Sequence, residues 1–355
     1  MTLEDLRHSI DAIDNQLIEL YNQRMRYVNE VGHIKNRTGA PIYRPEREQE
    51  ILMRLKRLNR ESQGVLSDQA IEALFLELFA VARNFELPEQ IAFLGPEASF
   101  THQAAETKFG ALSHYLPIGS IRGVFREVSR GQARFGVVPI ENSFNGIVSD
   151  TISCLSDYNL KIIAEVMIDI HHVFATEAED TRTIKRIYSK DIAFGQCKHF
   201  LEDFGLDEVE QIPVESTAKA AQLAIGDPES AAICAEVAAR MYRLPIRYSN
   251  IEDKGNNRTR FFVISDFENA PSGNDKTTIL VRLPNRPGAL VDFLLDFREE
   301  SIDLTKIKSH IVEGVSIFFI EFDGHKDDAP IKRIFDKHAG AIKFLGSYVK
   351  EADDV

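Results

Sequence analysis

The sequence predicts a multidomain protein, an all-helical segment followed by two α/β segments. Its 355 residues exceed the usual size of one domain, so we expect two or three. The hydrophobic pattern changes near residue 88 from helical periodicity to short β-rich runs alternating with helices. It changes again after the linker-like stretch 268–275. These three observations divide the chain into segments 1–88, 89–267 and 276–352.

The first segment contains one long helix and two shorter ones. Apolar residues recur at spacings of three and four, the a/d pattern of a helix that packs on other helices. This seam comprises Leu3, Leu6, Ile10, Ile13, Leu17, Leu20, Tyr27, Val31 and Ile34, with Arg24 among them. Pro45 suits the first turn of a second helix, and Ser67 suits the N-cap of a third. Three helices close a core poorly, so we expect the long helix to pair in a homodimer or a higher homo-oligomer.

The second segment is predicted to be a two-lobed α/β domain. Its strand candidates form two clusters with helical stretches between most of them. They are 91–94, 135–138, 162–164, 168–174, 231–233 and 261–264. Two such clusters predict a cleft between two lobes, which is a common place for small ligands.

The third segment shows the clearest order of elements. Strands are expected at 277–283, 304–311, 316–322 and 342–349, and helices at 289–297 and 331–338. This order is βαββαβ, the pattern of a ferredoxin-like module.

Composition limits the classes of partner. The chain has 42 Lys and Arg against 55 Asp and Glu, a net charge of −13. Such a surface repels phosphate backbones and anionic lipids, so we expect no nucleic-acid and no membrane partner. The three cysteines, Cys154, Cys197 and Cys234, form no CxxC pair, which favours a reduced, cytoplasmic protein. No sequence motif for a metal or redox cofactor occurs, and we expect none.

A cationic cluster marks the first segment. Arg24 occupies an a position of the seam, where burial of a guanidinium is costly without a partner. Lys35 lies three turns further along nearly the same face, and Arg47 is in phase with the apolar face of the second helix. These cations either pair with acids such as Glu30 and Glu48, or they form a pocket for a small dianion. Arginine suits such a pocket because its fork binds carboxylates with two hydrogen bonds.

The order of motifs along the chain resembles a known enzyme family. The runs Leu6-Arg7, Arg24, Glu30-Val31-Gly32 and Tyr43 to Glu48 resemble the all-helical chorismate mutases. The run 93–100, Phe-Leu-Gly-Pro-Glu-Ala-Ser-Phe, resembles prephenate dehydratase, whose fold is periplasmic-binding-protein-like. Pro287-Gly288-Ala289-Leu290 resembles an ACT regulatory domain. Together they resemble the bifunctional chorismate mutase–prephenate dehydratases, which rearrange chorismate to prephenate and convert prephenate to phenylpyruvate.

The resemblance assigns roles in a mutase site. Arg7 from the partner subunit, Arg24 and Arg47 would hold carboxylates or shape their site. Lys35 would donate to the ether oxygen, and Glu48 would contact the ring hydroxyl. The residues that would line the pocket further are Arg44, where an Asp may stand in the family, Ala82, where a Ser is common, and Glu86. Glu86 stands at the second ether-oxygen donor and must be protonated to donate. We therefore expect mutase activity to fall as pH rises above mild acidity.

The resemblance also assigns roles in a dehydratase site. Thr259 would be the catalytic hydroxyl, acting as a hydrogen-bond donor to the departing hydroxyl. Arg260 would bind a carboxylate, and Phe261 would pack near the ring. Glu141, Asn142 and Ser143 follow an apolar run, at a strand end of the kind that binds ligands. Ser216 and Thr217 at a helix start either bind an anion or only cap the helix.

A regulatory site is implied in the third segment, with L-phenylalanine as the expected effector at a dimer interface. Its candidate residues are Asn285, Pro287, Gly288, Ala289, Leu290 and Ser309. The run Lys308-Ser309-His310-Ile311 departs from the Glu-Ser-Arg-Pro of the family, which predicts a different strength or selectivity of feedback. Two other readings stay open: a non-catalytic amino-acid sensor, and a dehydratase that prefers arogenate.

Overall fold

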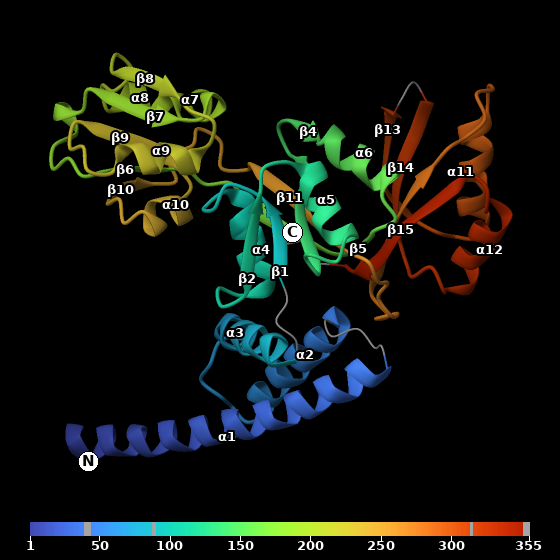
Figure 1. Cartoon of the computed structure of the whole chain (residues 1–355), viewed down its shortest axis with the longest axis horizontal. Coiled ribbons are helices and arrows are strands. Elements are labelled where there is room, and N and C mark those ends of the chain that lie inside the picture. Colours follow the sequence, from blue (N-terminus) through green and yellow to red (C-terminus); the bar gives the residue numbers. More distant parts are fainter. Residues whose placement is uncertain (39–43, 87–89, 313–314, 351–355) are drawn as a thin grey trace. The chain divides into compact units, whose positions relative to one another are not determined.

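The structure is a computed structural model that describes residues 1–38, 44–86, 90–312 and 315–350 (Figure 1). The chain forms two compact units. Unit 1 comprises Met1–Glu89 and the short stretch Phe109–His114, and unit 2 comprises Gln90–Lys108 and Tyr115–Val355. No helix among the described residues is long and apolar enough to cross a membrane.

Unit 1 is built from three helices, as predicted. They are α1 (Leu3–Thr38), α2 (Pro45–Glu61) and α3 (Asp68–Glu86). Pro45 occupies the first turn of α2, and the Ser67 hydroxyl accepts a hydrogen bond from the Ala70 amide at the start of α3. Gly32 lets α1 approach α3 closely, because a Cβ there would lie 3.1 Å from the Glu86 Cα. The C-terminal half of α1 therefore meets the end of α3.

The N-terminal half of α1 has no partner within unit 1. It extends beyond α2 and α3 (Figure 1), and its seam residues Ile10 and Ile13 are 56% and 55% exposed. A 36-residue helix is about 54 Å long, more than two shorter helices can cover. The predicted apolar seam is thus present and uncovered in a single chain.

Unit 2 begins with a mixed sheet of order β2-β1-β3-β11-β5, with β4 paired to β3. Its strands are β1 (Gln90–Leu94), β2 (His114–Ile118), β3 (Phe135–Asn142), β4 (Gly146–Ile147), β5 (Lys161–Asp169) and β11 (Arg258–Ser265). Its helices are α4 (Phe100–Phe109), α5 (Ile121–Ser129) and α6 (Ser149–Asp157). Strand β11 runs antiparallel between β3 and β5, although it is far from both in sequence.

The second sheet has the order β10-β6-β9-β7-β8. Its strands are β6 (Val173–Thr176), β7 (Arg186–Ser189), β8 (Glu210–Pro213), β9 (Ser230–Cys234) and β10 (Ile246–Ser249). Its helices are α7 (Asp191–Gln196), α8 (Lys198–Asp203), α9 (Thr217–Ala224), α10 (Glu236–Met241) and the 3₁₀ turn Thr181–Thr183. The two sheets form the two predicted lobes. The strand predicted at 168–174 is split between them, because β5 ends at Asp169 and β6 begins at Val173.

The C-terminal segment has the predicted βαββαβ order. It comprises β12 (Asp275–Val281), α11 (Ala289–Glu299), β13 (Leu304–Val312), β14 (Val315–Asp323), α12 (Ala329–Lys337) and β15 (Ile342–Val349). The sheet order is β13-β14-β12-β15, all antiparallel. One sheet face packs on α11 and α12 through residues such as Phe293 and Phe322. The other face packs on the first sheet of unit 2.

The packing between the C-terminal segment and the first sheet is tight. Leu280, Phe319 and Tyr348 share one apolar core with Phe262 and Ile264 of β11. At Gly346 the backbones of β15 and β5 come so close that a Cβ would collide with the Ile162 carbonyl. The C-terminal segment and the first sheet therefore form one folded body.

Candidate functional sites

The cationic cluster of unit 1 lies where the C-terminal part of α1 meets α3. The Lys35 ammonium is 2.7 Å from a carboxylate oxygen of Glu86, and both side chains are largely buried. Arg24 lies three turns before Lys35 on nearly the same face of α1. Its buried Nη1 has no hydrogen-bond partner among the described residues. Burial lowers the pKa of Arg24, while the nearby carboxylates of Glu48 and Glu86 oppose this effect. A buried guanidinium nitrogen without a partner is suited to bind an anion.

Glu48 joins this cluster through a residue that sequence reasoning missed. Arg83 of α3 is buried, forms an ion pair with Glu48 and donates from Nη2 to the Phe109 carbonyl at 2.7 Å. Its guanidinium also lies 5.5 Å from the centre of the Phe109 ring. The signal was available, because Arg83 follows buried Phe79 by four residues and precedes Glu86 by three, on one helix face.

The other residues predicted for this site make contacts of their own in a single chain. Arg7 is exposed on the uncovered half of α1. Arg44 pairs with Glu46 at 2.8 Å, and Ala82 is buried in α3. Arg47 was predicted to face inward, but its side chain is 61% exposed and pairs with Glu50 at 2.9 Å. Among the described residues this face of α2 is only partly covered, because Ile51 and Leu55 are half-buried whereas Leu58 is exposed.

In unit 2, the structure brings Thr259, Asn142 and Ser143 together. Thr259 of β11 and Asn142 of β3 are directly paired across the sheet. The Asn142 Nδ2 donates to the Thr259 Oγ1 at 2.9 Å and to the Asn257 Oδ1 at 2.7 Å. The Ser143 hydroxyl accepts from the Arg258 amide at 2.9 Å. Since Thr259 accepts a hydrogen bond from Asn142, its own proton is free to be donated to another group.

A cavity of about 490 Å³ adjoins this pair. Asn257, which accepts from Asn142, is part of its wall, and so are Phe144 and Asn145 just beyond Asn142. The remaining wall comes from α7 and from the chain that leads back to β11, namely Ile192, Gly195, Gln196, Glu252, Asp253 and Lys254. The cavity therefore lies in the cleft between the two lobes. The Thr259 hydroxyl and the Asn142 amide lie at its edge, and Phe144 and Ile192 in its wall suit a small ring-shaped ligand.

Two histidines connect the lobes beside this cavity. The His171 Nδ1 is 2.6 Å from a carboxylate oxygen of Glu252, and the His172 amide donates to the other oxygen at 2.9 Å. The His172 Nε2 is 2.9 Å from the Gln196 Oε1. Burial lowers the pKa of His172, which keeps its imidazole neutral. These bonds hold the chain between β5 and β6 and explain why the predicted strand is interrupted there.

Arg260 and Glu141 lie away from the Thr259 hydroxyl. Arg260 points from the opposite face of β11, because neighbouring residues of a strand alternate between faces. It is buried and forms two hydrogen bonds of 2.9 Å with Glu321 of the C-terminal segment. Glu141 forms an ion pair with Lys306 of the same segment. Burial would raise the pKa of Glu141, but Lys306 and Arg260 outweigh it and lower that pKa. Phe261 is buried in β11.

Ser216 lies at the start of α9, and the residues predicted for an effector lie around the start of α11, except Ser309, which lies on β13. The Ser216 hydroxyl accepts from the Lys219 amide at 3.1 Å, so it caps α9, and Thr217 behind it is buried. Gly288 has a φ of +82° at the start of α11, a conformation that favours glycine. Asn285, Pro287 and Ser309 are exposed, Leu290 is half-buried, and Ala289 is buried. The structure thus presents an open loop at the predicted effector position.

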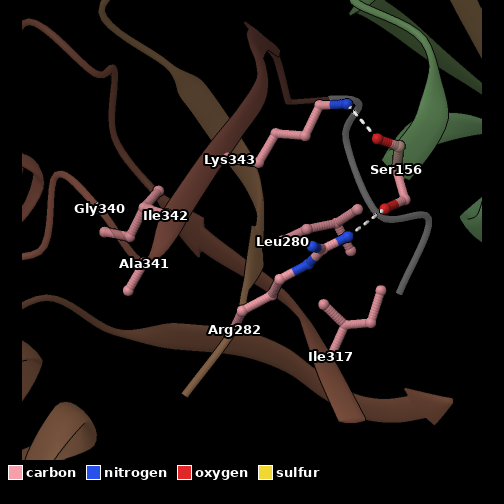
Figure 2. A pocket seen from close by; sticks show the side chains of 8 residues that line it. All are labelled: Ser156, Leu280, Arg282, Ile317, Gly340, Ala341, Ile342 and Lys343. Atoms are coloured by element: carbon pink, nitrogen blue, oxygen red, sulfur yellow. Dashed lines mark hydrogen bonds between the residues drawn. The ribbon is translucent and has the colours of Figure 1, made fainter. Parts of the chain in front are cut away.

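A second cavity, of about 290 Å³, lies on the C-terminal segment away from that loop (Figure 2). Lys343 and Arg282 reach across it to Ser156 at the end of α6 (Figure 2). The Lys343 ammonium also donates to the Tyr158 carbonyl at 2.9 Å. Carbonyls at a helix C-terminus attract cations, so Lys343 fastens the C-terminal segment to α6. None of the predicted effector residues lines this cavity.

Comparison with known proteins identifies the families that the two parts of the chain resemble. Residues 6–87 match the family model of chorismate mutase type II, and residues 91–269 match that of prephenate dehydratase. A bifunctional chorismate mutase/prephenate dehydratase of Aquifex aeolicus is 38% identical, and one of Pseudomonas aeruginosa is 39% identical. Each alignment covers 98% of this chain and 98% of the relative. The crystal structure of prephenate dehydratase from Arthrobacter aurescens in complex with L-Phe is similar, with a TM-score of 0.67 and 31% identity. That match covers 74% of this chain and 90% of the other.

Proposed function

This chain belongs to the family of bifunctional chorismate mutase/prephenate dehydratases, and we propose which of its residues act in each of the two reactions. It is an enzyme of phenylalanine biosynthesis. It rearranges chorismate to prephenate, and it removes carbon dioxide and water from prephenate to give phenylpyruvate. The residues proposed for the first reaction lie in unit 1, and those proposed for the second lie in unit 2.

For the mutase, we propose that the unpartnered nitrogen of Arg24 binds a substrate carboxylate. A Claisen rearrangement needs a folded substrate and stabilisation of charge on the ether oxygen, and it needs no nucleophile. Lys35 donates to that oxygen, and a protonated Glu86 donates beside it. Glu48, fixed by Arg83, contacts the ring hydroxyl. The Lys35–Glu86 ion pair occupies this place in the free enzyme and opens when substrate enters.

The partner subunit completes the mutase site in this proposal. Arg7 lies on the part of α1 that no other helix of unit 1 covers, beside an exposed apolar seam. Pairing of two such helices buries the seam and carries Arg7 to the Arg24 cluster of the other protomer. The same pairing covers the face of α2, so that Arg44, Arg47 and Ala82 border the pocket. The functional form is therefore a homodimer or a larger homo-oligomer.

For the dehydratase, the hydrogen bond from Asn142 to Thr259 carries the proposal. It fixes the hydroxyl oxygen and leaves the hydroxyl proton for the departing hydroxyl of prephenate. Loss of carbon dioxide and formation of an aromatic ring drive the reaction, so a weak proton donor is sufficient. Asn142, Ser143 and the cleft cavity hold the substrate beside it. Phe261, Arg260 and Glu141 support this site from within the sheet, and Ser216 and Thr217 stay candidate anion ligands from the second lobe.

We further propose that segment 276–352 is an ACT domain, with segments 1–88 and 89–267 as the mutase and the dehydratase domains. The element order of segment 276–352 and its strand order β13-β14-β12-β15 are those of ferredoxin-like modules. The effector proposed is L-phenylalanine, which the relative from Arthrobacter aurescens binds. Asn285, Pro287, Gly288, Ala289, Leu290 and Ser309 are its proposed ligands, shared between protomers. The cytoplasm is the proposed location, as the cysteine content favours.

Two substitutions test the division of the reactions. Arg24→Ala is expected to lower mutase turnover by about 100-fold or more and to leave dehydratase turnover unchanged. Thr259→Ala is expected to do the reverse, with a loss of about 100-fold or more. Chorismate consumption and phenylpyruvate formation are followed separately, and arogenate is compared with prephenate as the dehydratase substrate.

The matched controls are Arg26→Ala on the exposed side of α1 and Thr107→Ala on α4, where the hydroxyl only bonds the Gln103 carbonyl. Both controls should retain both activities. Loss of both activities from either site variant in a folded protein would contradict two separate sites.

A further inference from the structure

Six charged side chains meet where the C-terminal segment packs on the first sheet of unit 2. Glu141 of β3, Glu165 of β5 and Arg260 of β11 come from the first sheet. The other three are Lys276 of β12, Lys306 of β13 and Glu321 of β14, from the C-terminal segment. We call these six residues the junction cluster. Its three cations and three anions balance, which is a condition for burying charges at low cost.

Three pairs of the junction cluster cross between the two sheets, namely Arg260–Glu321, Lys276–Glu165 and Lys306–Glu141. Arg260 and Glu321 are joined by two hydrogen bonds of 2.9 Å, and Arg260 also contacts Glu165 at 3.2 Å. The Lys276 ammonium donates to Glu165 at 2.6 Å, and Lys306 pairs with Glu141. Arg260 is 5% exposed and Glu321 is 1% exposed, so their pair is shielded from water. A bidentate pair of this kind fixes orientation as well as distance.

Strand alternation explains why these residues face each other. Glu321 lies on the same face of β14 as Ile317 and Phe319, which pack on the first sheet. Arg260 lies on the same face of β11 as Phe262, and its guanidinium is 5.1 Å from the centre of the Phe262 ring. The ring of Phe262 in turn lies 6.3 Å from that of Phe319. The charges therefore sit at the edge of a shared apolar core.

The junction cluster is adjacent in sequence to the proposed dehydratase residues. Arg260 follows Thr259, and Glu141 precedes Asn142. Thr259 and Asn142 are the residues whose side chains form the 2.9 Å hydrogen bond at the cleft. The first sheet thus holds the cleft pair on one side and the junction cluster on the other.

We propose that Glu321 and Lys306 of the C-terminal segment are positioning residues for the dehydratase reaction. This inference rests on the proposed function, and it means that side chains of the C-terminal segment position residues of the dehydratase site. Glu321 holds Arg260 and thereby the placement of Thr259 on β11, and Lys306 holds Glu141 and thereby the placement of Asn142 on β3. An effector that displaces the C-terminal sheet would act on these same two ion pairs.

The removal of a partner has a defined consequence. In Glu321→Gln, the carboxylate that accepts both hydrogen bonds of the Arg260 guanidinium is lost, and this buried cation keeps Glu165 at 3.2 Å and Glu141 at 3.8 Å. Such a cation moves toward its remaining partner or toward water, and β11 moves with it. A small displacement of a group that acts on the transition state lowers kcat rather than raising KM.

The test compares Glu321→Gln and Lys306→Met with wild type in the full-length protein. Both variants are expected to lower dehydratase kcat by about 10- to 100-fold, with smaller changes in KM and with unchanged mutase activity. Glu321→Asp keeps the charge with a shorter reach and is expected to restore part of the lost kcat. Thermal unfolding followed by circular dichroism confirms that each variant is folded at the assay temperature.

Two matched controls come from the same segment. Asp323→Asn removes a carboxylate of β14 that pairs with Lys350 at 2.8 Å, and Lys337→Met removes a cation that pairs with Asp296 at 2.7 Å. Both pairs lie within the C-terminal segment, so both controls should retain dehydratase kcat. A purely structural role of Glu321 would lower the unfolding temperature without a change in the kcat of folded protein.

Dehydratase kcat values of Glu321→Gln and Lys306→Met within about twofold of the controls would overturn the inference. Because Lys306 is nearer the surface than Glu321, its variant reports on the inference even when Glu321→Gln unfolds. Wild-type turnover of prephenate is measured first, and this measurement alone tests the proposed dehydratase function. Its absence would overturn the dehydratase assignment together with this inference, whereas an active wild type with unaffected variants would overturn the inference alone.

Discussion

The role of single residues in unit 1 depends on which carboxylates are charged. Lys35 and Glu86 form an ion pair in the free enzyme, so Glu86 is an acceptor there. Its proposed task in the reaction is to donate, and a carboxyl group donates only when protonated. The chemistry proposed for Glu86 therefore requires a proton that the resting ion pair excludes.

This requirement predicts a pH dependence of the mutase reaction. Mutase kcat/KM is expected to fall as pH rises above mild acidity, because only a protonated carboxyl group can donate a hydrogen bond. Glu86→Gln, which donates at every pH, should flatten the profile. The control Glu72→Gln removes a surface carboxylate of the same helix that pairs with Lys56, and it should keep the wild-type slope. A flat wild-type profile would contradict the role given to Glu86.

Arg83 leads to a second prediction. Arg83→Met removes the partner of Glu48 and the donor to the Phe109 carbonyl, and it is expected to destabilise the protein by about 3 kcal/mol. Mutase activity of the remaining folded protein should fall by about tenfold, because Glu48 is no longer held in place. Arg83→Lys should be intermediate, since an ammonium lacks the two-way fork.

Urea unfolding gives the stability, and chorismate consumption gives the activity. Arg60→Met is the control, because Arg60 pairs with Asp68 on the surface between the same two helices. An equal loss of mutase activity in Arg83→Met and Arg60→Met would contradict the proposal that Arg83 holds Glu48 in place for the reaction.

His172 predicts a pH dependence of stability. Burial lowers its pKa from the ordinary value of 6.5, so the unfolded chain takes up a proton at a higher pH than the folded chain does. The free energy of unfolding is therefore retained above pH 6.5 and falls as pH decreases below it, by up to about 1.4 kcal/mol per pH unit. His172→Asn, which keeps a polar group near Gln196, should remove this slope.

The measurement is urea unfolding between about pH 6.5 and pH 5, above the range in which carboxylates titrate. His8→Asn on the exposed face of α1 is the control and should leave the slope in place. An unchanged slope in His172→Asn would assign the proton uptake to another group.

At the scale of elements, helices and strands with a long hydrophobic period were predicted reliably, whereas several of the shortest strands were not predicted. The heptad seam of α1 and the alternation of the C-terminal segment extend over many residues, and both were predicted closely. Strands β7, β8 and β10 have four residues each and were not predicted, because four residues hardly establish a period. The order of strands in the first sheet was also beyond prediction, since β11 is inserted between β3 and β5 from far along the chain.

The candidate sites show the same limit. Thr259, Asn142 and Ser143 were predicted for the dehydratase site and lie together, because Asn142 ends β3 and Thr259 stands at the start of its antiparallel neighbour β11. Arg260 was expected beside Thr259, but neighbouring side chains of a strand point to opposite faces. The packing of the C-terminal sheet on the first sheet places Glu321 against Arg260. Arg83 was missed although it shares a helix face with Phe79 and Glu86, and its bond to the Phe109 carbonyl, a backbone atom, leaves no trace in a side-chain pattern.

The uncovered helix α1 predicts a dependence on oligomerisation. Ile13→Asp places a charge in the apolar seam and should prevent pairing of the long helices. Mutase activity is expected to fall more than tenfold, as Arg7 no longer reaches the site of the other protomer, while dehydratase activity stays measurable. Light scattering reports the mass of the particle, and both activities are measured on the same sample.

Asn15→Asp is the control for this prediction. It adds the same charge to the same helix, two residues away and outside the a/d positions of the seam. The control should retain the mass and the mutase activity of wild type. A monomeric wild type with full mutase activity would contradict a site shared between protomers.

At the scale of the whole molecule, the two units differ in how they are completed. Unit 1 exposes a long apolar seam, and in our proposal a second chain covers it and completes the cationic site. In unit 2, three sheets form one body, because the C-terminal segment packs on the first sheet through an apolar core and the junction cluster. We therefore expect the mutase to respond to association between chains and the dehydratase to respond to changes within one chain.

The close approach at Gly346 has a consequence for anyone who wishes to exchange regulatory modules between enzymes. A foreign module with any side chain at this position would push against the Ile162 carbonyl and could not dock on β5. A functional chimera must therefore bring a glycine there, together with an acid and a base where Glu321 and Lys306 stand. The boundary for such a transplant follows this docking surface, and a cut placed in the linker alone would join two parts that do not fit.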